Sequence, residues 1–529
     1  MTAAAADEVA PGRARRRLKV TGTLHAASPI HVGGLSTHPG IDLDLAVDGT
    51  GTPTLPGDSL AGALRAWHDS AFGPDAAARL WGPLAARGTQ PAASPTMIDD
   101  VALPADALTE VRDGIGIDRA TGAAATGIKF VRAVLAAGTP LPVDLTIDVT
   151  DEQDQSERLL AELATLQQAL RARRVRIGAA KTRGLGRVGL VTDLQVHNHL
   201  LTSRDGMLAY LRNHHRPILL PEPVDATVAT PAIEAELRWR PVGALLVRAA
   251  VTGIAADTMP LVGTGPDRML HLLLPGSSIK GALRSRAERI VRTVLDTSAP
   301  TDPYPDVRFR RTLAEHDLVT ALFGTAADRQ HPCRGAAAPR QGALFIEDCH
   351  ADRPLAPDLW RELQQAPRSR ARDQLAALGL ARDDPPPGSA PTAAHAEFAD
   401  HVAIDRFTGG SAPRRLFTVL EPHGFAWSPM RLRIELRRID PETQPALLGL
   451  LTLVLRSVAA GQVPFGFDTT RGLGDVLVEH VELFGEDLEH SAVAAPWRSG
   501  DLDTFVDRFG ATLRPAWQTW IDASRGPTP

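Results

Sequence analysis

The sequence predicts an α+β fold made of two tandem units of the same design. Three short motifs occur twice, and in the same order, along the 529 residues. They occupy 55–65, 117–122 and 182–186 in the first copy, and 274–284, 404–409 and 470–474 in the second. A shorter match, Leu-Trp-Gly at 80–82 and Leu-Phe-Gly at 322–324, fits the same order. The second copy has about 68 additional residues between its first two long motifs, which indicates a duplication with one insertion.

The first unit reads as β-α-β-hairpin-β-α-β. An alternating strand at 18–30 is followed by a glycine-rich loop and an acidic segment at 41–48. The first motif then opens a helix that runs to about Ala71. The remaining elements are strands at 97–100 and 143–149, a hairpin over 117–134 and a helix over 151–173. This order is that of a split βαβ, or ferredoxin-like, fold, which RNA-recognition domains use.

Composition shifts suggest the domain boundaries. Residues 1–17 end in Arg15, Arg16 and Arg17, and we predict a disordered basic tail or an arm that touches RNA. The predicted parts that follow are a first domain at 18–200, a linker at 201–233, a second domain at 234–485 and a helical tail at 486–529. We place the insertion within about 297–400, and we expect the second domain to begin with a strand at 245–251.

Composition also limits the function. Hydrophobic residues make up 43% of the chain and charged residues 22%, as in ordinary globular proteins. Two cysteines cannot form a disulfide framework, and no apolar run has the length of a membrane span or signal peptide. We therefore expect a cytoplasmic protein with no membrane partner. A net charge of −5 argues against binding nucleic acid by bulk charge but not against a local basic groove.

The first motif predicts a helix start that suits a phosphate. A proline and a glycine end the preceding segment, a serine is expected to cap the helix, and the free N–H groups and helix dipole attract anions. The candidate RNA-binding residues here are Ser59, Arg65, Ser277, Ser278, Lys280 and Arg284. The alternative is a well-capped helix packed closely on a sheet through Gly62 and Gly281.

The third motif is a basic glycine loop. Glycines let the backbone approach phosphates, and cations neutralise them. The candidates are Lys181, Arg183, Gly184, Gly186 and Arg187, with Arg471, Gly472 and Gly474 in the second copy. Neither loop fits the pattern of a nucleotide-hydrolysing P-loop. The alternative, a plain turn between helix and strand, is less attractive for a loop that occurs twice.

In this order, the motifs resemble the RAMP superfamily of CRISPR effector proteins. Within that superfamily they are most similar to backbone subunits of type III complexes, and two units in one chain resemble the fused subunits of type III-D-like systems. The resemblance covers most of 18–200 and 235–485. It implies that the protein binds CRISPR RNA, target single-stranded RNA and other effector subunits. It also implies that the middle motif forms a thumb contacting the guide–target duplex, with Arg119, Lys129, Arg406, Arg414 and Arg415 as candidate contacts.

The resemblance further implies an endoribonuclease whose catalytic aspartate follows the first strand. Asp42 matches this position best and Asp44 is the fallback. The second unit offers Asp267 or Asp257, neither of them after an isoleucine, in an interval that looks shorter. We therefore predict asymmetric activity, with a divalent metal such as Mg²⁺ assisting cleavage.

Three further hypotheses concern metal and function. His331, Cys333, Cys349 and His350 bracket part of the insertion and could bind zinc, although buried free cysteines are an alternative reading. A second possible function is a non-catalytic RNA-binding scaffold. A third is an endonuclease that processes the guide RNA, for which His25, His31 and His38 are candidate bases.

Overall fold

The computed structural model describes residues 15–35, 38–84, 93–149, 153–212, 214, 217–226, 228–325, 340–382, 394–494 and 496–525. The first unit contains β1 (Arg16–Ala26), β2 (Thr54–Leu55), α1 (Gly57–Phe72), α2 (Pro74–Trp81), β3 (Thr96–Ile98), β4 (Val101–Ala102), β5 (Thr109–Gly114), β6 (Phe130–Leu135), β7 (Pro140–Val149), α3 (Gln153–Arg171), β8 (Val188–Leu200), α4 (Arg204–Leu211) and β9 (Pro217–Ile218).

The second unit contains β10 (Ala232–Pro241), β11 (Val262–Thr264), β12 (Leu270–Leu274), α5 (Gly276–Leu295), α6 (Pro305–Ala314), α7 (Asp317–Phe323), β13 (Gly324–Thr325), β14 (Arg340–Gln341), β15 (Leu344–Ile346), β16 (Cys349–His350), α8 (Pro357–Gln365), α9 (Arg368–Ala377), β17 (His395–Ile404), β18 (Ser411–His423), β19 (Met430–Glu435), η1 (Leu436–Arg438), α10 (Gln444–Ala459), η2 (Thr469–Arg471), β20 (Val476–Glu486), η3 (Leu488–His490), β21 (Ser499–Asp501) and α11 (Leu502–Arg525). None of the described helices has the length and apolar character needed to cross a membrane.

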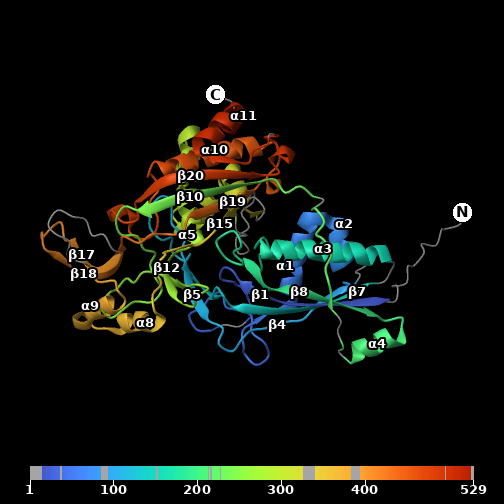
Figure 1. Ribbon diagram of the computed structural model, residues 1–529. Helices are drawn as coiled ribbons and strands as arrows, with labels where there is room; N and C mark the ends of the chain where they lie inside the picture. The colour runs from blue at the N-terminus through green and yellow to red at the C-terminus, as the bar shows by residue number, and fades with distance from the viewer. Residues whose placement is uncertain are drawn as a thin grey trace.

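Each unit is built on a five-stranded antiparallel sheet (Figure 1). The strand orders are β3-β7-β1-β8-β9 and β15-β19-β10-β20-β21. Four strands of each sheet, taken in chain order with their two helices, give β-α-β-β-α-β with the first strand between the third and the fourth. This is the ferredoxin-like arrangement, so the predicted fold is confirmed in both units.

Alternating side chains explain the layers. In β1, Leu18, Val20 and Leu24 are buried and pack with Leu60 of α1 and Leu163 of α3. One face of the sheet is therefore apolar and covered by two helices. The second unit repeats the arrangement with α5 and α10 over β10 and adds α11, which contributes the predicted amphipathic helix of the tail (Figure 1).

Several boundaries differ from the prediction. Arg16 and Arg17 belong to β1, and Arg17 forms an ion pair with Asp148 (2.6 Å). The Arg15 N–H donates to the Val149 carbonyl oxygen, so these three arginines are part of the first domain and not of the predicted tail. The predicted linker contains α4 and β9, and β9 extends the first sheet. The second domain begins with β10. The strand predicted at 245–251 does not form, because this stretch is the loop after β10, which corresponds to the loop after β1 in the first unit.

The additional residues of the second unit are not one block. α6 precedes α7, whereas α8 and α9 follow β16, and the core strand β15 lies between these additions. α8 and α9 bury Trp360, Leu363 and Leu375 in a small separate core with Leu420 and Phe425. This core supports the base of the long hairpin β17–β18.

The helix of the first motif starts differently from the prediction. Its N-cap is Pro56 or Pro275, and no serine side chain caps either helix. The N–H groups of Gly57 and Gly276 instead donate to Oδ1 of Asp100 and Asp348, both at 2.8 Å. A carboxylate of the protein thus already occupies the anion position at the helix dipole. Ser59, Ser277 and Ser278 are therefore not caps, and the phosphate role predicted for this helix start is filled.

The glycines that matter in this motif also differ. A Cβ atom on Gly57 would lie 2.3 Å from the Ile98 carbonyl oxygen, and one on Gly276 2.7 Å from that of Ile346. Gly62 and Gly281 would meet nothing within 4 Å. The close approach of helix to sheet therefore occurs at the first helical residue and not one turn later.

The arginine of this motif is structural in both copies. Arg65 donates through Nη1 to the carbonyl oxygen of Gly82, and Arg284 does the same to that of Gly324 (2.7 Å). Gly82 follows α2 and Gly324 follows α7, so in both units the arginine binds a backbone carbonyl at a helix end. This contact explains why the first motif and the Leu-aromatic-Gly motif recur together. Arg284 is buried with all three side-chain nitrogens bound within the protein, so it is wrong as a predicted RNA contact, whereas contact of Arg65 with RNA stays a prediction.

Candidate nucleic-acid interface

The first glycine loop lies where the two units meet. Arg183 forms a parallel bridge with Ile346 of β15, and the Thr182 carbonyl oxygen accepts from Lys280 Nζ of α5 at 3.4 Å. Gly184 has a φ of +93°, and a Cβ atom there would lie 2.1 Å from Asp348 Oδ1. This glycine is therefore required by both its backbone conformation and the close approach of the second unit.

Two arginines at this junction have no acidic partner. The side chains of Arg183 and Arg132, the latter on β6, make no ion pair or hydrogen bond within the described part of the chain, and Arg132 Nε is buried. Burial, and next the positive charge of Arg183, lower the pKa of Arg132 to about 10. Burial likewise lowers the pKa of Arg183. Two neighbouring, partly buried cations without a counterion favour an anion supplied from outside.

The other cations of the loop differ in whether an acidic side chain already binds them. Arg187 donates through Nη1 to Glu347 Oε2 at 3.1 Å and forms a second, shorter bond to Oε1. Arg176, which precedes the loop, also faces Glu347 at 3.9 Å. Lys181 has no ion pair among the described residues, and burial lowers its pKa. Lys181 and Arg183 are thus available to a ligand, whereas Arg187 is held by the second unit.

Lys280 is buried beside this cluster. Its Nζ donates to the Leu344 carbonyl oxygen at 2.7 Å. Burial, followed by the positive charges of Arg183 and Arg284, lowers its pKa to about 7. Lys280 therefore supports the junction and is only partly charged at neutral pH.

The low pKa of Lys280 makes a prediction about stability. Its folded pKa of about 7 lies below the ordinary 10.5, so the unfolded chain holds the additional proton between these values. The free energy of unfolding of the wild type should therefore rise with pH across this window, relative to a Lys280→Met variant. Urea unfolding at several pH values measures the difference, with Lys129→Met as the exposed control. Parallel pH profiles of wild type and Lys280→Met would contradict the prediction.

The middle motif builds the same turn in both hairpins. The N–H of Gly122 donates to the Asp118 carbonyl oxygen, and that of Gly409 to the Asp405 carbonyl oxygen, both at 2.8 Å. Each aspartate side chain accepts from the backbone two residues later, at 3.0 Å in Asp118 and 2.7 Å in Asp405. The aspartate is thus a turn former in both hairpins.

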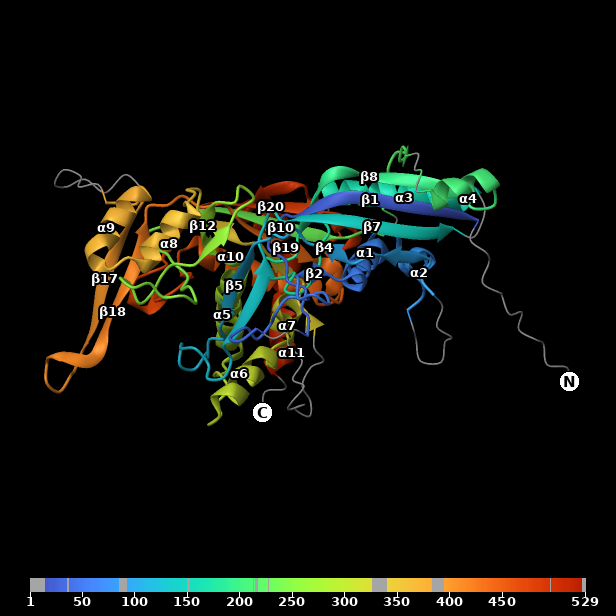
Figure 2. The same cartoon turned by 90° about the horizontal axis from the view of Figure 1, so that it is seen from below.

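The surroundings of the two hairpins differ. The tip of β5–β6 packs against α5 and α6, where Arg119 Nε contacts Glu288 Oε2 at 2.6 Å and Asp118 pairs with Arg308 (Figure 2). Lys129 pairs with Asp113 at 2.9 Å. Arg119 is thus an interdomain contact, which corrects its predicted role on RNA.

The hairpin β17–β18 projects away from the rest of the molecule (Figure 2). Its candidate contacts Arg406, Arg414 and Arg415 are exposed, and none has an ion pair within the described ranges. Phe407 at its tip is 98% exposed. These residues form an accessible basic and apolar surface.

The second glycine loop is also open. Arg471 pairs with Asp468 at 2.9 Å and lies over the ring of Phe417. Gly472 is exposed, and a Cβ atom on it would meet nothing within 4 Å. Gly474 matches Gly186: a Cβ atom on either would lie 2.0–2.2 Å from the carbonyl oxygen of Phe465 or Ile177. The last glycine of each loop is therefore structural.

Asp42 and Asp257 occupy equivalent positions. The N–H of Val131 donates to Asp42 Oδ2 at 2.7 Å, and the N–H of Thr418 donates to Asp257 Oδ2 at 2.8 Å. In both units the residue after the aspartate forms a parallel bridge with the second hairpin strand, Leu43 with Arg132 and Thr258 with Val419. Both aspartates are exposed. The expectation that the second unit lacks a clear counterpart is wrong, because strand pairing and not the preceding residue positions this carboxylate.

The other two acidic candidates have local roles. Asp44 is buried and accepts from His38 Nδ1 (2.5 Å) and from the backbone N–H of Leu45 (2.9 Å). Burial acts to raise its pKa, but the hydrogen bonds from His38 and Leu45 lower it overall. Asp267 accepts from the N–H of Met269 at 3.1 Å within the turn between β11 and β12. Neither matches the geometry shared by Asp42 and Asp257.

The predicted zinc residues are only partly described. His331 and Cys333 lie outside the described residues. Cys349 is fully buried, and burial raises the pKa of its thiol well above the ordinary value. In the described ranges, Cys349 and His350 belong to no group of three or more potential metal ligands. The buried-cysteine interpretation fits Cys349.

Sequence reasoning missed Arg132, Asp348 and Glu288. Arg132 interrupts an otherwise apolar strand, Phe-Val-Arg-Ala-Val-Leu, and such a cation is a signal that could have been noticed. Asp348 caps α5 and also pairs with Arg112 of the first unit at 2.6 Å. Contacts of this kind between distant segments leave no local pattern.

Comparison with known proteins supports the duplication. A sequence model of the RAMP superfamily matches residues 23–189 and 261–476. No curated protein matches the chain. The two matched stretches cover most of the chain, and each overlaps one ferredoxin-like unit. The chain therefore belongs to the RAMP superfamily of CRISPR-associated RNA-binding proteins.

Proposed function

We propose that this protein is a backbone subunit of a type III CRISPR effector complex that holds the guide RNA and cleaves the target RNA. One observation carries RNA binding: Arg132 and Arg183 lie together at the unit junction without an acidic partner among the described residues. RNA phosphates would supply the missing negative charge. A local cluster of this kind is compatible with a net charge of −5.

Cleavage is proposed at Asp42 and Asp257. Each is an exposed carboxylate whose Oδ2 is held by a backbone N–H, which leaves Oδ1 for the ligand. A carboxylate beside a strained phosphodiester can assist in-line attack by the adjacent 2′-hydroxyl. A Mg²⁺ ion is commonly bound by one or two carboxylates together with substrate phosphates, so each aspartate fits such a site when RNA is present. When bound, the ion would stabilise charge on the phosphate.

The contacts between the two units suggest how other effector subunits bind. The first hairpin and first glycine loop contact α5, α6 and β15 of the second unit. The tip of the second hairpin and the second glycine loop are exposed, and among the described residues they form no ion pair with the first unit. We therefore expect the second hairpin and loop to contact an equivalent RAMP unit on another subunit.

Two alternatives remain part of the proposal's tests. A non-catalytic scaffold would bind RNA and never cut it. A guide-processing enzyme would need an accessible base, but His31 is buried with Nδ1 on the Ala133 carbonyl oxygen (2.7 Å), and His38 is paired with Asp44. Burial also lowers the pKa of His25. The His38 side chain is 64% exposed, so mapping of the cut RNA, and not the histidines, separates the effector function from guide processing.

Arg183→Gln is expected to weaken guide RNA binding about tenfold, nearly equally for different spacer sequences, because it removes one phosphate contact. The slope of log affinity against log salt should fall by about 0.7. Lys181→Gln should act in the same direction. Filter binding of single-stranded guide RNA over a range of salt concentrations measures both effects.

Arg471→Gln is the matched control. It changes the same position of the motif in the second loop, where the guanidinium is already paired with Asp468. A loss confined to certain spacer sequences would show that the loop reads bases and would contradict the phosphate-contact proposal. Unchanged affinity in Arg183→Gln would remove its main support.

A further inference from the structure

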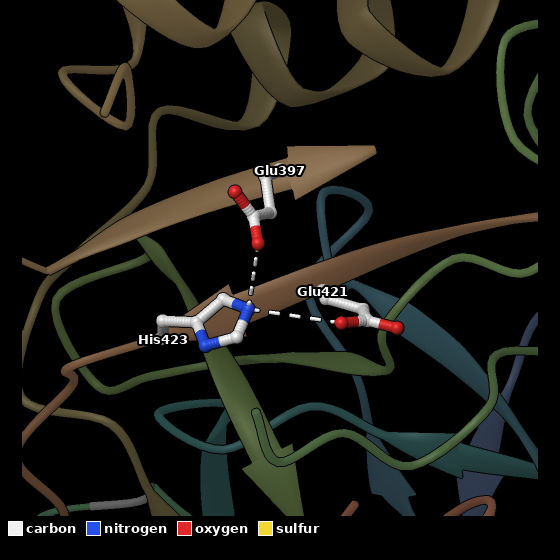
Figure 3. Close-up of side chains that lie close together, drawn as sticks. All are labelled: Glu397, Glu421 and His423. Atoms are coloured by element: carbon white, nitrogen blue, oxygen red, sulfur yellow. Dashed lines mark ion pairs between the residues drawn. The ribbon is translucent and has the colours of Figure 1, made fainter. Parts of the chain in front are cut away.

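A cluster of ionisable side chains lies at the base of the second hairpin (Figure 3). Glu397 of β17 and Glu421 of β18 are direct cross-strand partners. Like charges placed opposite each other destabilise an antiparallel pair unless a cation lies between them. His423 lies two residues after Glu421, and its ring points toward both carboxylates (Figure 3).

The distances fit ligands of one metal ion better than hydrogen bonds. His423 Nε2 lies 3.5 Å from Glu397 Oε1 and 3.7 Å from Glu421 Oε2. This nitrogen is buried and makes no hydrogen bond to a described residue. Ligands bound tetrahedrally to zinc at 2.0–2.2 Å are separated by roughly 3.4 Å. All three ligand atoms lie within 4.8 Å of one another, so small side-chain rotations bring them around one ion.

The outer oxygens of both carboxylates are already held. Glu397 Oε2 accepts from Arg382 Nη1 at 3.0 Å, and Glu421 Oε1 lies 3.1 Å from His401 Nε2. Such contacts orient metal-binding carboxylates and leave one oxygen of each for the ion. A mixed set of one imidazole and two carboxylates suits zinc better than magnesium or calcium, which prefer oxygen ligands alone.

The first unit shows that the hairpin does not need these groups. In its hairpin, Glu110 pairs with Val134 as Glu397 pairs with Glu421, and Ala136 stands where the second unit has His423. Val134 is 0% and Ala136 1% exposed. The second unit thus has ionisable side chains, Glu421 and His423, at two positions that are apolar and buried in the first unit. Packing alone gives no reason for this exchange.

We propose that Glu397, Glu421 and His423 bind one zinc ion that joins the two strands at the base of the second hairpin. Three protein ligands leave a fourth position for water or a further side chain. The ion would stiffen the hairpin where it leaves the small core formed by α8 and α9. This site is separate from Asp42, Asp257 and the junction arginines, and its test does not depend on RNA.

The test uses a double variant, Glu421→Val with His423→Ala, which installs the residues of the first unit. The full chain is incubated with ZnCl₂, dialysed, and analysed for bound zinc by mass spectrometry. We expect one zinc fewer per chain in the double variant than in the wild type. Zinc should also raise the melting temperature of the wild type, and the increase should be complete at one zinc per chain. The increase in the double variant should be smaller.

His490→Ala is the control, because His490 is exposed, lies 3.9 Å from Glu489 and belongs to no group of three or more potential ligands in the described ranges. Comparing variants removes any contribution from histidines or cysteines elsewhere. Equal zinc content in wild type and double variant, or a loss of zinc as large in His490→Ala, would overturn the proposal. The first of these outcomes would show that the cluster holds no zinc, and the second would indicate adventitious zinc only.

Discussion

Asp42→Ala and Asp257→Ala are each expected to remove one cut in the target RNA, by about 100-fold or more, and to leave guide binding unchanged. Loss of a positioned carboxylate at a reacting centre commonly costs 10²–10⁴ in rate. Both carboxylates are held by the same backbone contact to the second hairpin strand, so equal effects in the two units are expected. The Asp42→Ala/Asp257→Ala double variant should lose both cuts. Target RNA labelled at one end and mapped on a gel separates these cases.

Asp267→Ala is the control, since Asp267 closes a turn and pairs with His271 (3.3 Å) but lacks the backbone contact shared by Asp42 and Asp257. If Asp257→Ala leaves every cut intact while Asp42→Ala removes one, the units are asymmetric despite their shared geometry. If the assembled wild-type complex never cuts target RNA, the protein is a scaffold and both aspartates have another role.

Glu288→Ala is expected to lower the free energy of unfolding by about 3–5 kcal/mol, because it would leave two buried arginines unpaired. Glu288 is 0% exposed and accepts from Arg119 at 2.6 Å and from Arg284 at 2.8 Å. Arg119 belongs to the first unit, so this carboxylate joins the two units as well as supporting α5. Thermal or urea unfolding of the full chain measures the loss.

Asp193→Ala provides the comparison. Asp193 also pairs with an arginine, Arg171, at 2.6 Å, but both side chains are more than half exposed. Exposed pairs contribute little to stability. A Glu288→Ala variant as stable as Asp193→Ala would show that the buried triad is not needed to hold the units together.

The motifs were informative about the fold and misleading about individual contacts. The first motif predicted a helix start correctly, yet Asp100 and Asp348 cap that helix and Arg65 and Arg284 bind carbonyl oxygens. These residues recur because each unit needs them for its own packing. A motif that occurs twice therefore reveals a repeated structural requirement as readily as a repeated binding site.

The glycine loops show that similar sequences can also have different surroundings. Their central Thr-Arg-Gly-Leu-Gly sequences are identical, although Lys181 and Arg187 flank only the first loop. The structure further distinguishes Arg183, partly buried at the junction without an acidic partner in the described part of the chain, from Arg471, exposed and paired with Asp468. The difference depends on which surface faces the other unit.

The sequence by itself determined the duplication, the strand and helix order and the ferredoxin-like fold, because these follow from periodicity and from short-range turn chemistry. The tertiary structure decided that Asp257, not Asp267, matches Asp42, that Arg132 joins Arg183, and that Glu397, Glu421 and His423 converge. Each of these depends on strand register or on contacts between segments far apart in the chain. Such contacts are set by the packing of the whole molecule, so no local pattern in the sequence records them.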